Sequence, residues 1–376
     1  MIKSYSLTAR EVASGASYGA IEDDQHAATA VKNAIEQMPV GTVIGSVLLF
    51  LTSAYAHSPQ NAIKAAAKAA GTPQVFGCCA IGLLTEQEWL LDVEGAVAMV
   101  FPQHLSLHAL TVLKQQGINP DSVLTLTTPN AATLAVNANN INQIGSIATD
   151  EYGHGPFSVW QSGRIVEQEY CQSAFPESVK QVVKVAGGVK RISPFMRIDL
   201  ADGHCLEEIN AQAATDNLTA NLPENLQSFG SNNPFGLLCG ISENDQKESI
   251  EQGHYKLHHV VSNNQKTKHI HLSGSAKEDH YLFWGIRDQQ YAQDSMLAEL
   301  KAAKEELGES PKYALMFPNI GRGAEFFNGR DRDLELFKEV FPDTPLLGFY
   351  GNGEISPGHK LNGLIRRYST VFGIYA

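Results

Sequence analysis

Positive charge is scarce in this chain of 376 residues, which has 28 Lys and Arg against 40 Asp and Glu and a formal net charge of −12. No cluster of Lys and Arg offsets that balance. Such a surface repels phosphate groups, so the composition argues against nucleic acid or an anionic membrane as a partner.

Long apolar runs and paired cysteines are also missing. The first residues, MIKSYSLTAREVASG, lack the apolar core of a signal peptide, and the most apolar stretch, 43–56, is too short to span a bilayer. The five cysteines form no C-x-x-C pair. We therefore expect a reduced, cytoplasmic protein with no membrane insertion.

Standard catalytic motifs are absent as well. The chain has no G-x-S-x-G, H-E-x-x-H or P-loop, and its G-x-G at 351–353 does not continue into G-x-x-G and a helix. The sequence therefore matches no standard hydrolase, zincin or kinase, and no dinucleotide-binding claim follows from its glycines; we expect a non-catalytic protein.

The order of expected elements predicts a duplicated, mixed α+β (α/β) fold. A β-α-β-β pattern follows residue 46 and appears again after residue 313. We expect two similar lobes, each a β-sheet with β-α-β-β units and flanking helices, in domains 1–192 and 193–376. The expected helices are 23–38, 60–70, 104–116, 206–218, 288–307 and 333–340, and an antiparallel meander is expected at 255–261, 268–273 and 281–285.

The stretch 344–359 combines an expected strand, a glycine-rich turn and a carboxylate. An apolar strand at 346–350 leads into the turn Gly351-Asn352-Gly353, which presents the carboxylate of Glu354. The segment 77–82 echoes it, because Gly77 and Gly82 have the spacing of Gly348 and Gly353 and both segments follow a Thr-Pro pair. We expect the two turns to frame one pocket.

Arg322, between Gly321 and Gly323, is the natural companion of Glu354. Both lie in glycine-rich loops at the carboxyl ends of expected strands, where open α/β sheets hold ligands. Arg322 can grip a carboxylate ligand while Glu354 accepts from an ammonium. The alternative is that the two side chains pair and brace the loops.

Cys78 and Cys79 occupy the turn of the first half. Adjacent strand residues point to opposite faces, so at most one faces a common pocket. They are either small core residues or ligand-contacting, redox-sensitive thiols. A cysteine-dependent enzyme is a further alternative, although that segment contains no histidine to act as base.

Histidines offer a metal or haem alternative. His269 and His271 share one strand face, and His258 or His259 is a candidate cross-strand partner for zinc or haem iron. Because no spaced carboxylate or thiol completes a set, an exposed polar sheet face is the competing interpretation. His154 is a further, isolated candidate.

The run A-L-M-F-P-N-I-G-R-G-A-E-F-F and the later F-P-D-T-P-L-L-G-F-Y-G-N-G-E-I-S-P resemble the C-terminal half of FIST-domain proteins. The segment G-C-C-A-I-G-L-L-T-E resembles their N-terminal half. Two positions depart from the family pattern, which often has a Cys where Asn319 stands and a His-Gly pair where Arg366-Arg367 stands.

The resemblance implies a bacterial, small-ligand-binding sensory protein for signal transduction. It implies action through a separate partner such as a histidine kinase. The residues that match the family pattern are Gly321, Arg322, Gly323, Gly348, Gly351, Gly353, Glu354, Gly77, Cys78 and Gly82. Some relatives are haem proteins that sense nitric oxide, which makes a haem- or metal-binding sensor the alternative, with haem as its cofactor.

Overall fold

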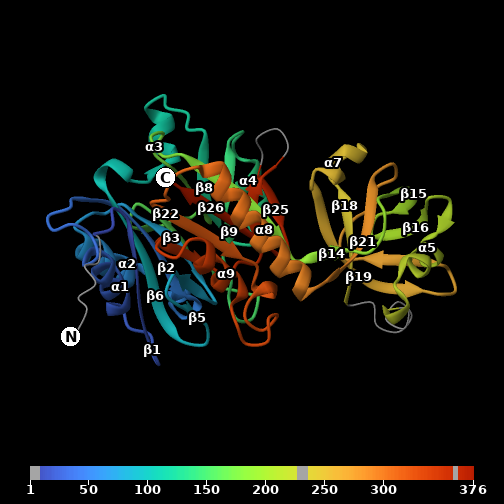
Figure 1. The fold of residues 1–376 in the computed structure, drawn as a ribbon, viewed down its shortest axis with the longest axis horizontal. Helices are drawn as coiled ribbons and strands as arrows, with labels where there is room; N and C mark the ends of the chain where they lie inside the picture. The colour runs from blue at the N-terminus through green and yellow to red at the C-terminus, as the bar shows by residue number, and fades with distance from the viewer. Residues whose placement is uncertain (1–8, 227–235, 359–362) are drawn as a thin grey trace. The chain divides into compact units, whose positions relative to one another are not determined.

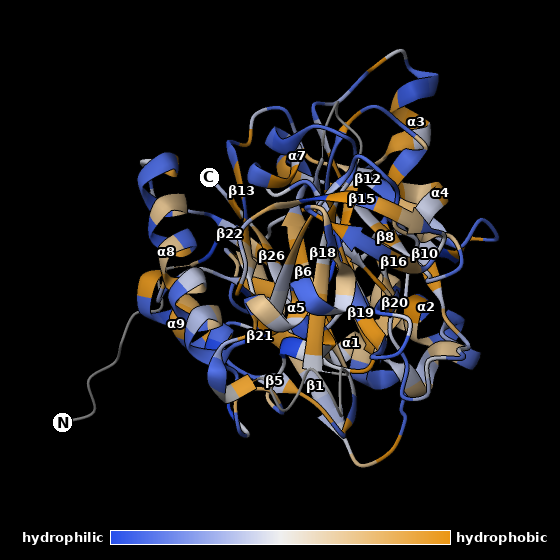
Figure 2. Cartoon of the chain, turned by 90° about the vertical axis from the view of Figure 1, so that its right-hand side faces the viewer, coloured by the Kyte–Doolittle hydropathy of each residue, from blue (hydrophilic) through white to orange (hydrophobic). Residues whose placement is uncertain are grey.

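The computed structural model describes residues 9–226, 236–358 and 363–376, and within them the chain has the expected mixed α+β class (Figure 1). Strand β2 (Ile44–Thr52) is mostly apolar and is buried from Ser46 onward, whereas helix α8 (Gln289–Leu307), labelled in Figure 2, mixes hydrophobic and hydrophilic residues. A strand covered on both faces needs such an uninterrupted apolar run. Across the described residues, no helix combines the length and apolar character needed to cross a membrane.

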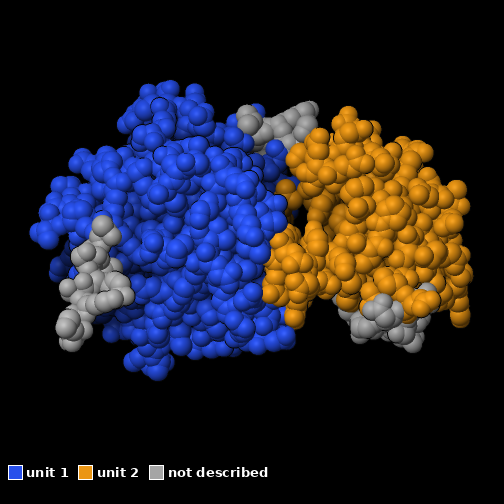
Figure 3. Space-filling model, in the orientation of Figure 1, with its two compact units in different colours: residues 1–186, 296–365, 369–376 blue, residues 187–295, 366–368 orange. Residues whose placement is uncertain are grey.

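The chain divides into two compact units (Figure 3). Unit 1 comprises residues 1–186, 296–365 and 369–376, and unit 2 comprises residues 187–295 and 366–368. The C-terminal segment thus returns to the unit that the first half builds. The sequence led us to expect one boundary between residues 192 and 193, whereas the two units change over after residues 186, 295, 365 and 368.

Among its described residues, unit 1 contains three six-stranded sheets, each with two parallel strands joined by a helix. The three β-α-β segments are β2, α2 (Gln60–Ala70) and β3 (Val75–Ala80); β8 (Ser122–Thr127), α4 (Ala132–Asn137) and β9 (Asn142–Ile147); and β22 (Tyr313–Pro318), α9 (Arg332–Val340) and β23 (Leu346–Phe349). The repetition predicted from the two glycine turns is confirmed, and the structure adds a third copy.

The three repeats exchange hairpins in a cycle. After each parallel pair, the chain sends a hairpin to the sheet of another repeat and then returns to its own. The hairpins are β4 (Leu83–Thr85) with β5 (Trp89–Leu90), beside β23; β10 (Val159–Gln161) with β11 (Arg164–Ile165), beside β3; and β24 (Glu354–Pro357) with β25 (Gly363–Arg366), beside β9. The returning strands are β6 (Glu94–Pro102), β12 (Tyr170–Ala174) and β26 (Ser369–Tyr375).

Each repeat begins with an edge strand and a helix. These elements are β1 (Ala13–Gly19) with α1 (Gln25–Ile35), β7 (His108–Ala109) with α3 (Leu110–Gln115), and β13 (Gln181–Gly187) with α8. The chain of unit 2 is inserted in the third repeat, between β13 and most of α8. Short 3₁₀ helices are η1 (Ser53–His57), η2 (Gln103–Leu105), η3 (Glu224–Leu226) and η5 (Ile320–Arg322).

A glycine stands at the same place in the second parallel strand of every repeat. Gly77, Gly145 and Gly348 lie opposite Leu49, Thr125 and Met316, respectively. A Cβ at these glycines would lie 1.7, 1.8 and 1.7 Å from the carbonyl oxygen of the opposite residue. No side chain fits at that distance, so the close approach of the strands requires glycine.

Unit 2 is a closed antiparallel barrel. Its elements are β14 (Val189–Arg191), β15 (Met196–Asp202), β16 (Cys205–Ile209), β17 (Gln212–Ala213), α5 (Ala214–Asn221), β18 (Leu237–Ser242), α7 (Lys247–Glu251), β19 (Tyr255–Asn264), β20 (His269–Leu272) and β21 (Tyr281–Arg287). Strands β21, β15, β16, β20, β19 and β18 pair in that order, and β18 pairs back to β21. Trp284, Leu206 and Ile270 belong to its buried core.

Two expectations for unit 2 are wrong. The expected helix 206–218 is the strand β16, a turn through Asn210 and Ala211 with φ of 48° and 57°, and only then a helix from Ala214. Apolar residues spaced as Leu206 and Ile209 suit a helix, but β16 gains ladder hydrogen bonds from strands on both sides. The third strand of the expected meander pairs with β15 and β18 instead of β20.

Candidate functional site

The third repeat concentrates buried polar side chains at the carboxyl ends of its parallel strands. β22 leads to Asn319 and Arg322, while β23 leads through the turn 351–353 to Glu354 at the start of β24. Asn319 and Gly351 form a parallel bridge that holds the two strand ends together. Arg322 and Glu354 therefore follow neighbouring parallel strands, as the sequence predicted, although Arg322 ends a 3₁₀ helix and Glu354 begins a strand.

Glu354 is fully buried instead of displayed at the tip of its turn. Its Oε1 accepts a hydrogen bond of 2.8 Å from Asn319 Nδ2, and its Oε2 accepts one of 2.7 Å from the Ser369 hydroxyl. Burial raises the pKa of Glu354 to about 8, although the hydrogen bonds from Ser369 and Asn319 oppose that shift. The neutral acid is therefore its main form at pH 7.

Arg322, with 1% of its surface exposed, forms a bidentate ion pair with Asp333 at the start of α9. Its Nε donates to Asp333 Oδ2 at 2.8 Å and its Nη2 donates to Oδ1 at 3.0 Å. Nη1 donates to the Ala186 carbonyl at 3.1 Å, and Thr370 Oγ1 donates to Asp333 at 2.5 Å. In this arrangement Arg322 braces the loop, with Asp333 as the ion-pair partner where the sequence suggested Glu354.

Sequence reasoning missed Asp331 and Asp333. Asp331 accepts from the Leu334 backbone N–H at 2.8 Å, which caps α9, and also from the Tyr350 hydroxyl. Burial and the neighbouring Asp333 raise the pKa of Asp331 to about 6. The signal was an Asp-Arg-Asp run just before an amphipathic helix, which marks an N-cap.

The other repeats carry apolar residues where the third has Glu354. The three equivalent glycines are followed by Cys78, Ser146 and Phe349, which lie opposite Val159, Glu354 and Leu83, respectively. Val159 and Leu83 are as buried as Glu354. Val and Leu fill the two equivalent positions, so packing alone does not require a carboxyl group there. Burial of that group costs free energy, which indicates a role other than packing.

The two glycine turns meet directly. The Tyr350 N–H donates to the Gly82 carbonyl at 2.9 Å. The Thr149 hydroxyl of the second repeat accepts from the Ile81 N–H at 2.9 Å and donates to the Tyr350 carbonyl at 2.8 Å. The expected neighbourhood of 77–82 and 348–354 is thus present, and it is a hydrogen-bonded junction of all three repeats.

Cys78 and Cys79 point to opposite faces of β3 and enter different core clusters. Both are fully buried or nearly so, and burial raises the pKa of each thiol. A buried thiol that stays protonated is a weak nucleophile and packs as a small apolar residue.

The candidate histidines do not form one cluster. His154 is exposed in the loop before β10. On the β19–β20 ladder, His271 lies opposite Ser262 and His269 opposite Asn264, so neither His258 nor His259 faces them. The expected cross-strand partnership is wrong because β19 runs longer than predicted and moves the register.

His258 and His259 have different surroundings on β19. Partial burial, together with the charges of Arg367 and Lys256, lowers the pKa of His258 to about 4. The Nε2 of His259 is 2.7 Å from the hydroxyl oxygen of Tyr368. His258 is therefore neutral at pH 7, and His259 belongs to a hydrogen-bonded pair.

That pair lines a cavity of about 320 Å³ within unit 2. The Arg287 guanidinium lies 4.9 Å from the centre of the Tyr368 ring. The lining consists of Leu226, Gly236, Leu237, Leu238, His259, Ile286, Arg287 and Tyr368. Mostly apolar walls with a few convergent polar groups are typical of small-molecule sites.

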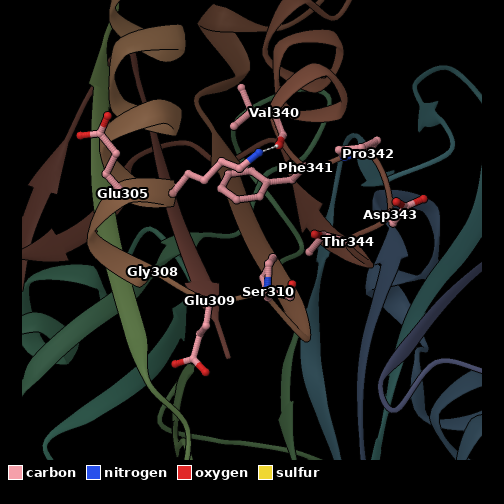
Figure 4. A pocket seen from close by; sticks show the side chains of 11 residues that line it. Glu305, Gly308, Glu309, Ser310, Val340, Phe341, Pro342, Asp343 and Thr344 are labelled. Atoms are coloured by element: carbon pink, nitrogen blue, oxygen red, sulfur yellow. Dashed lines mark hydrogen bonds between the residues drawn. The ribbon is translucent and has the colours of Figure 1, made fainter.

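A larger hollow of about 580 Å³ lies in unit 1, where α8 and α9 end (Figure 4). Its floor includes Phe341, and Lys304 Nζ donates to the Val340 carbonyl at 3.1 Å. Figure 4 shows the carboxylates of Glu305, Glu309 and Asp343 pointing in different directions around it. Its polar groups do not converge on one point, so it is a weaker candidate for a specific ligand.

The architecture defines a class of protein: a mixed α+β chain with a repeat-built unit and an inserted barrel that holds a small cavity. Two family models match consecutive parts of it, the FIST N domain over residues 46–212 and the FIST C domain over residues 211–357. The chain belongs to the FIST family, whose domains are described as sensory and ligand-binding.

Similar proteins share only part of their length with this chain. Human F-box only protein 22 is 35% identical over 89 residues, which are 23% of this chain and 21% of that protein. An uncharacterised protein of Mycobacterium bovis is 26% identical over 129 residues, which are 34% of this chain and 33% of that protein. The matches thus span about a fifth to a third of these relatives.

Proposed function

We propose that the protein is a non-catalytic, cytoplasmic sensor that binds a small molecule in the cavity of unit 2. It passes the signal to a separate partner, with a histidine kinase as the expected class. The cavity carries the proposal, because it sets a cation, a phenol and an imidazole against apolar walls.

The chemistry of the lining indicates what such a ligand carries. The guanidinium of Arg287 is charged at any physiological pH and prefers planar anions. Leu237, Leu238 and Ile286 offer apolar contact beside it. A small carboxylic acid with a short apolar body, such as an apolar amino acid or a keto acid, matches both features.

A titration with a panel of amino acids and short carboxylic acids tests this ligand class. Arg287→Gln should weaken binding of any hit at least tenfold, since a charge-assisted hydrogen bond to a ligand is lost. Arg191→Gln is the matched control, because Arg191 also stacks on an aromatic ring of unit 2, 4.3 Å from the Phe195 centre, but does not line the cavity. Equal affinities for wild type and Arg287→Gln would remove the cavity as the ligand site.

The junction of the glycine turns is a second proposed ligand site. It would use Arg322, Glu354 and the backbone of Gly77, Gly321, Gly323, Gly351, Asn352 and Gly353, beside Cys78 and Cys79. The support is that Glu354 is a buried acid where two equivalent positions are apolar. In the same titration, a loss of affinity in Glu354→Gln with none in Arg287→Gln would assign the ligand to unit 1.

A haem sensor is the second candidate function, and the same cavity favours it. His259 and Tyr368 carry an imidazole and a phenol, both of which ligate haem iron in proteins. Bound haem would supply an iron that takes up nitric oxide. His259 Nε2 is hydrogen-bonded to the Tyr368 hydroxyl, so this hydrogen bond would have to break before the same nitrogen could ligate iron.

A visible spectrum separates the two candidates. After addition of hemin, a Soret band that is lost in His259→Ala or Tyr368→Phe and kept in His154→Ala supports the haem sensor. No Soret shift relative to free hemin leaves the small-molecule proposal alone. Autophosphorylation of a candidate histidine kinase, measured with and without the protein, then tests the partner.

A further inference from the structure

One face of the unit 2 barrel gathers metal-ligating side chains from two neighbouring strands. Cys205 and Glu207 lie on β16, and His269 lies on β20. One donor atom from each (the thiol sulfur, a carboxylate oxygen and an imidazole nitrogen) lies within 4.8 Å of both others. Glu207 Oε2 is 4.0 Å from His269 Nε2.

The strand register explains why these three meet. Cys205 lies opposite His271 and Leu206 opposite Ile270, and the same antiparallel register carried one residue further sets Glu207 opposite His269. Leu206 and Ile270 are fully buried in the barrel core. Because side chains alternate along a strand, the residues on either side of them share the outer face.

The donor atoms are available to an ion. In the parts of the chain that the structure describes, no hydrogen bond engages the side chains of Cys205 and Glu207 or the ring of His269. Glu207 and His269 have 29% and 34% of their side-chain surface exposed, so an ion can reach them without unfolding. Asp202, opposite Cys205 on β15, adds a further negative charge next to the cluster.

We propose that Cys205, Glu207 and His269 bind a zinc ion, with the fourth coordination position left to solvent. A thiolate, an imidazole and a carboxylate are a donor set that Zn²⁺ accepts, whereas Mg²⁺ and Ca²⁺ prefer oxygen alone. Bonds of the usual zinc lengths set tetrahedral ligand atoms roughly 3.3–3.8 Å apart. Because the three donor atoms lie within 4.8 Å of one another, a side-chain movement of about 1 Å brings them to that spacing.

This site is separate from the proposed ligand cavity, with which it shares no lining residue. It also gives a role to one of the two histidines, His269 and His271, that the sequence analysis singled out. His269 and His271 lacked a thiol or carboxylate partner as long as 206–218 was expected to be a helix. With β16 as a strand, Cys205 and Glu207 become the neighbours of His269.

Zinc titration of chelator-treated protein tests the proposal. We expect one Zn²⁺ per chain, with affinity at least tenfold lower in each of Cys205→Ser, Glu207→Gln and His269→Ala. His271→Ala is the matched control, because His271 lies on the same strand and face but outside the cluster, and its affinity should stay within threefold of wild type. All four changes are at partly or fully exposed positions, and circular dichroism verifies that each variant is folded.

Cobalt gives a second readout that does not depend on affinity. A cobalt-loaded protein should show a thiolate-to-cobalt charge-transfer band in the near ultraviolet, and Cys205→Ser should abolish it while His271→Ala keeps it. The proposal is overturned if wild type binds no stoichiometric zinc, or if Cys205→Ser binds zinc and cobalt as wild type does. An equal loss in His271→Ala and His269→Ala would overturn the three-residue assignment.

Discussion

The first and third repeats of unit 1 have the same backbone plan and different chemistry. In both, a glycine presses against the opposite parallel strand, Gly77 against Leu49 and Gly348 against Met316. Beside these glycines, the exchanged hairpin supplies Leu83 to the third sheet, whereas the third repeat supplies Glu354 to the second sheet. Equivalent positions therefore hold an apolar side chain in one case and a buried acid in the other.

This difference distinguishes the residues that the fold itself requires from the polar residues that only one repeat contains. The glycines are needed in every repeat because strand spacing leaves no room for a Cβ. The polar network of Asn319, Glu354 and Ser369 occurs at one strand end and costs desolvation, which the pKa of Glu354 records. Substitution of an equivalent glycine should therefore lower the free energy of unfolding by a similar amount in every repeat. Substitution in the polar network should have an effect that is specific to the third repeat.

The largest effect is expected from glycine replacement. Gly77→Val and Gly348→Val should each lower the free energy of unfolding by more than about 5 kcal/mol, because the new Cβ overlaps a backbone oxygen that cannot move away. Urea denaturation and soluble yield measure the change. Gly187→Ala is the control, since its Cβ would meet nothing nearer than 3.6 Å. A mild effect at one of the two valine variants would show that the repeats are not equivalent scaffolds.

Breaking the buried ion pair should come next. Arg322→Met leaves the Asp333 carboxylate buried without its partner and should cost about 3–5 kcal/mol. Arg330→Met, which breaks the Arg330–Glu335 pair with 64% of the arginine side chain exposed, should cost about 0–1 kcal/mol. Similar costs in urea denaturation of the two variants would mean that Arg322 does not brace the loop.

The smallest effect is a pH dependence specific to the third repeat. The folded-state pKa of Glu354, about 8, lies above its ordinary value of 4.5, so the folded state holds this proton more tightly. The stabilisation is present in full below pH 4.5 and is lost as pH rises through 8. Between pH 6 and 9, wild type should therefore lose roughly 2–3 kcal/mol relative to Glu354→Gln, which cannot ionise.

Thermal and urea unfolding of both proteins at matched pH values measures that difference. Leu83→Met, a volume-conserving change at the equivalent position, should leave the pH slope of wild type unchanged. A slope that persists in Glu354→Gln would assign the titration to another group.

Local patterns in the sequence predicted much of the scaffold. Helix α8 begins and ends where periodicity and the Asp288 cap placed it, and Asp288 Oδ1 accepts from the Tyr291 N–H at 2.7 Å. The glycine echo of 77–82 and 348–353 marked two of the three repeats. The third copy was not predicted, because Gly145 is followed five residues later by Asp150 instead of a glycine.

The site was harder to predict because its partners are distant in the sequence. Arg322 and Glu354 were recognised, but their partners Asp333, Asn319 and Ser369 are chosen by how strands and α9 pack. The failed helix at 206–218 shows the same limit: Leu206 and Ile209 have helical spacing, and pairing with β15 and β20 makes the segment a strand despite it.

The sequence by itself determined the family, the α+β class, the glycines at two of the three strand contacts and the residues of the two turns, because these depend on local conformation and on short motifs. Tertiary structure alone decided three things: the cyclic exchange of hairpins, the burial that raises the pKa of Glu354, and the proximity of Cys205 and Glu207 to His269. Each depends on strand pairing between residues far apart in the chain, and a register shift of one residue would move every side chain to the other face.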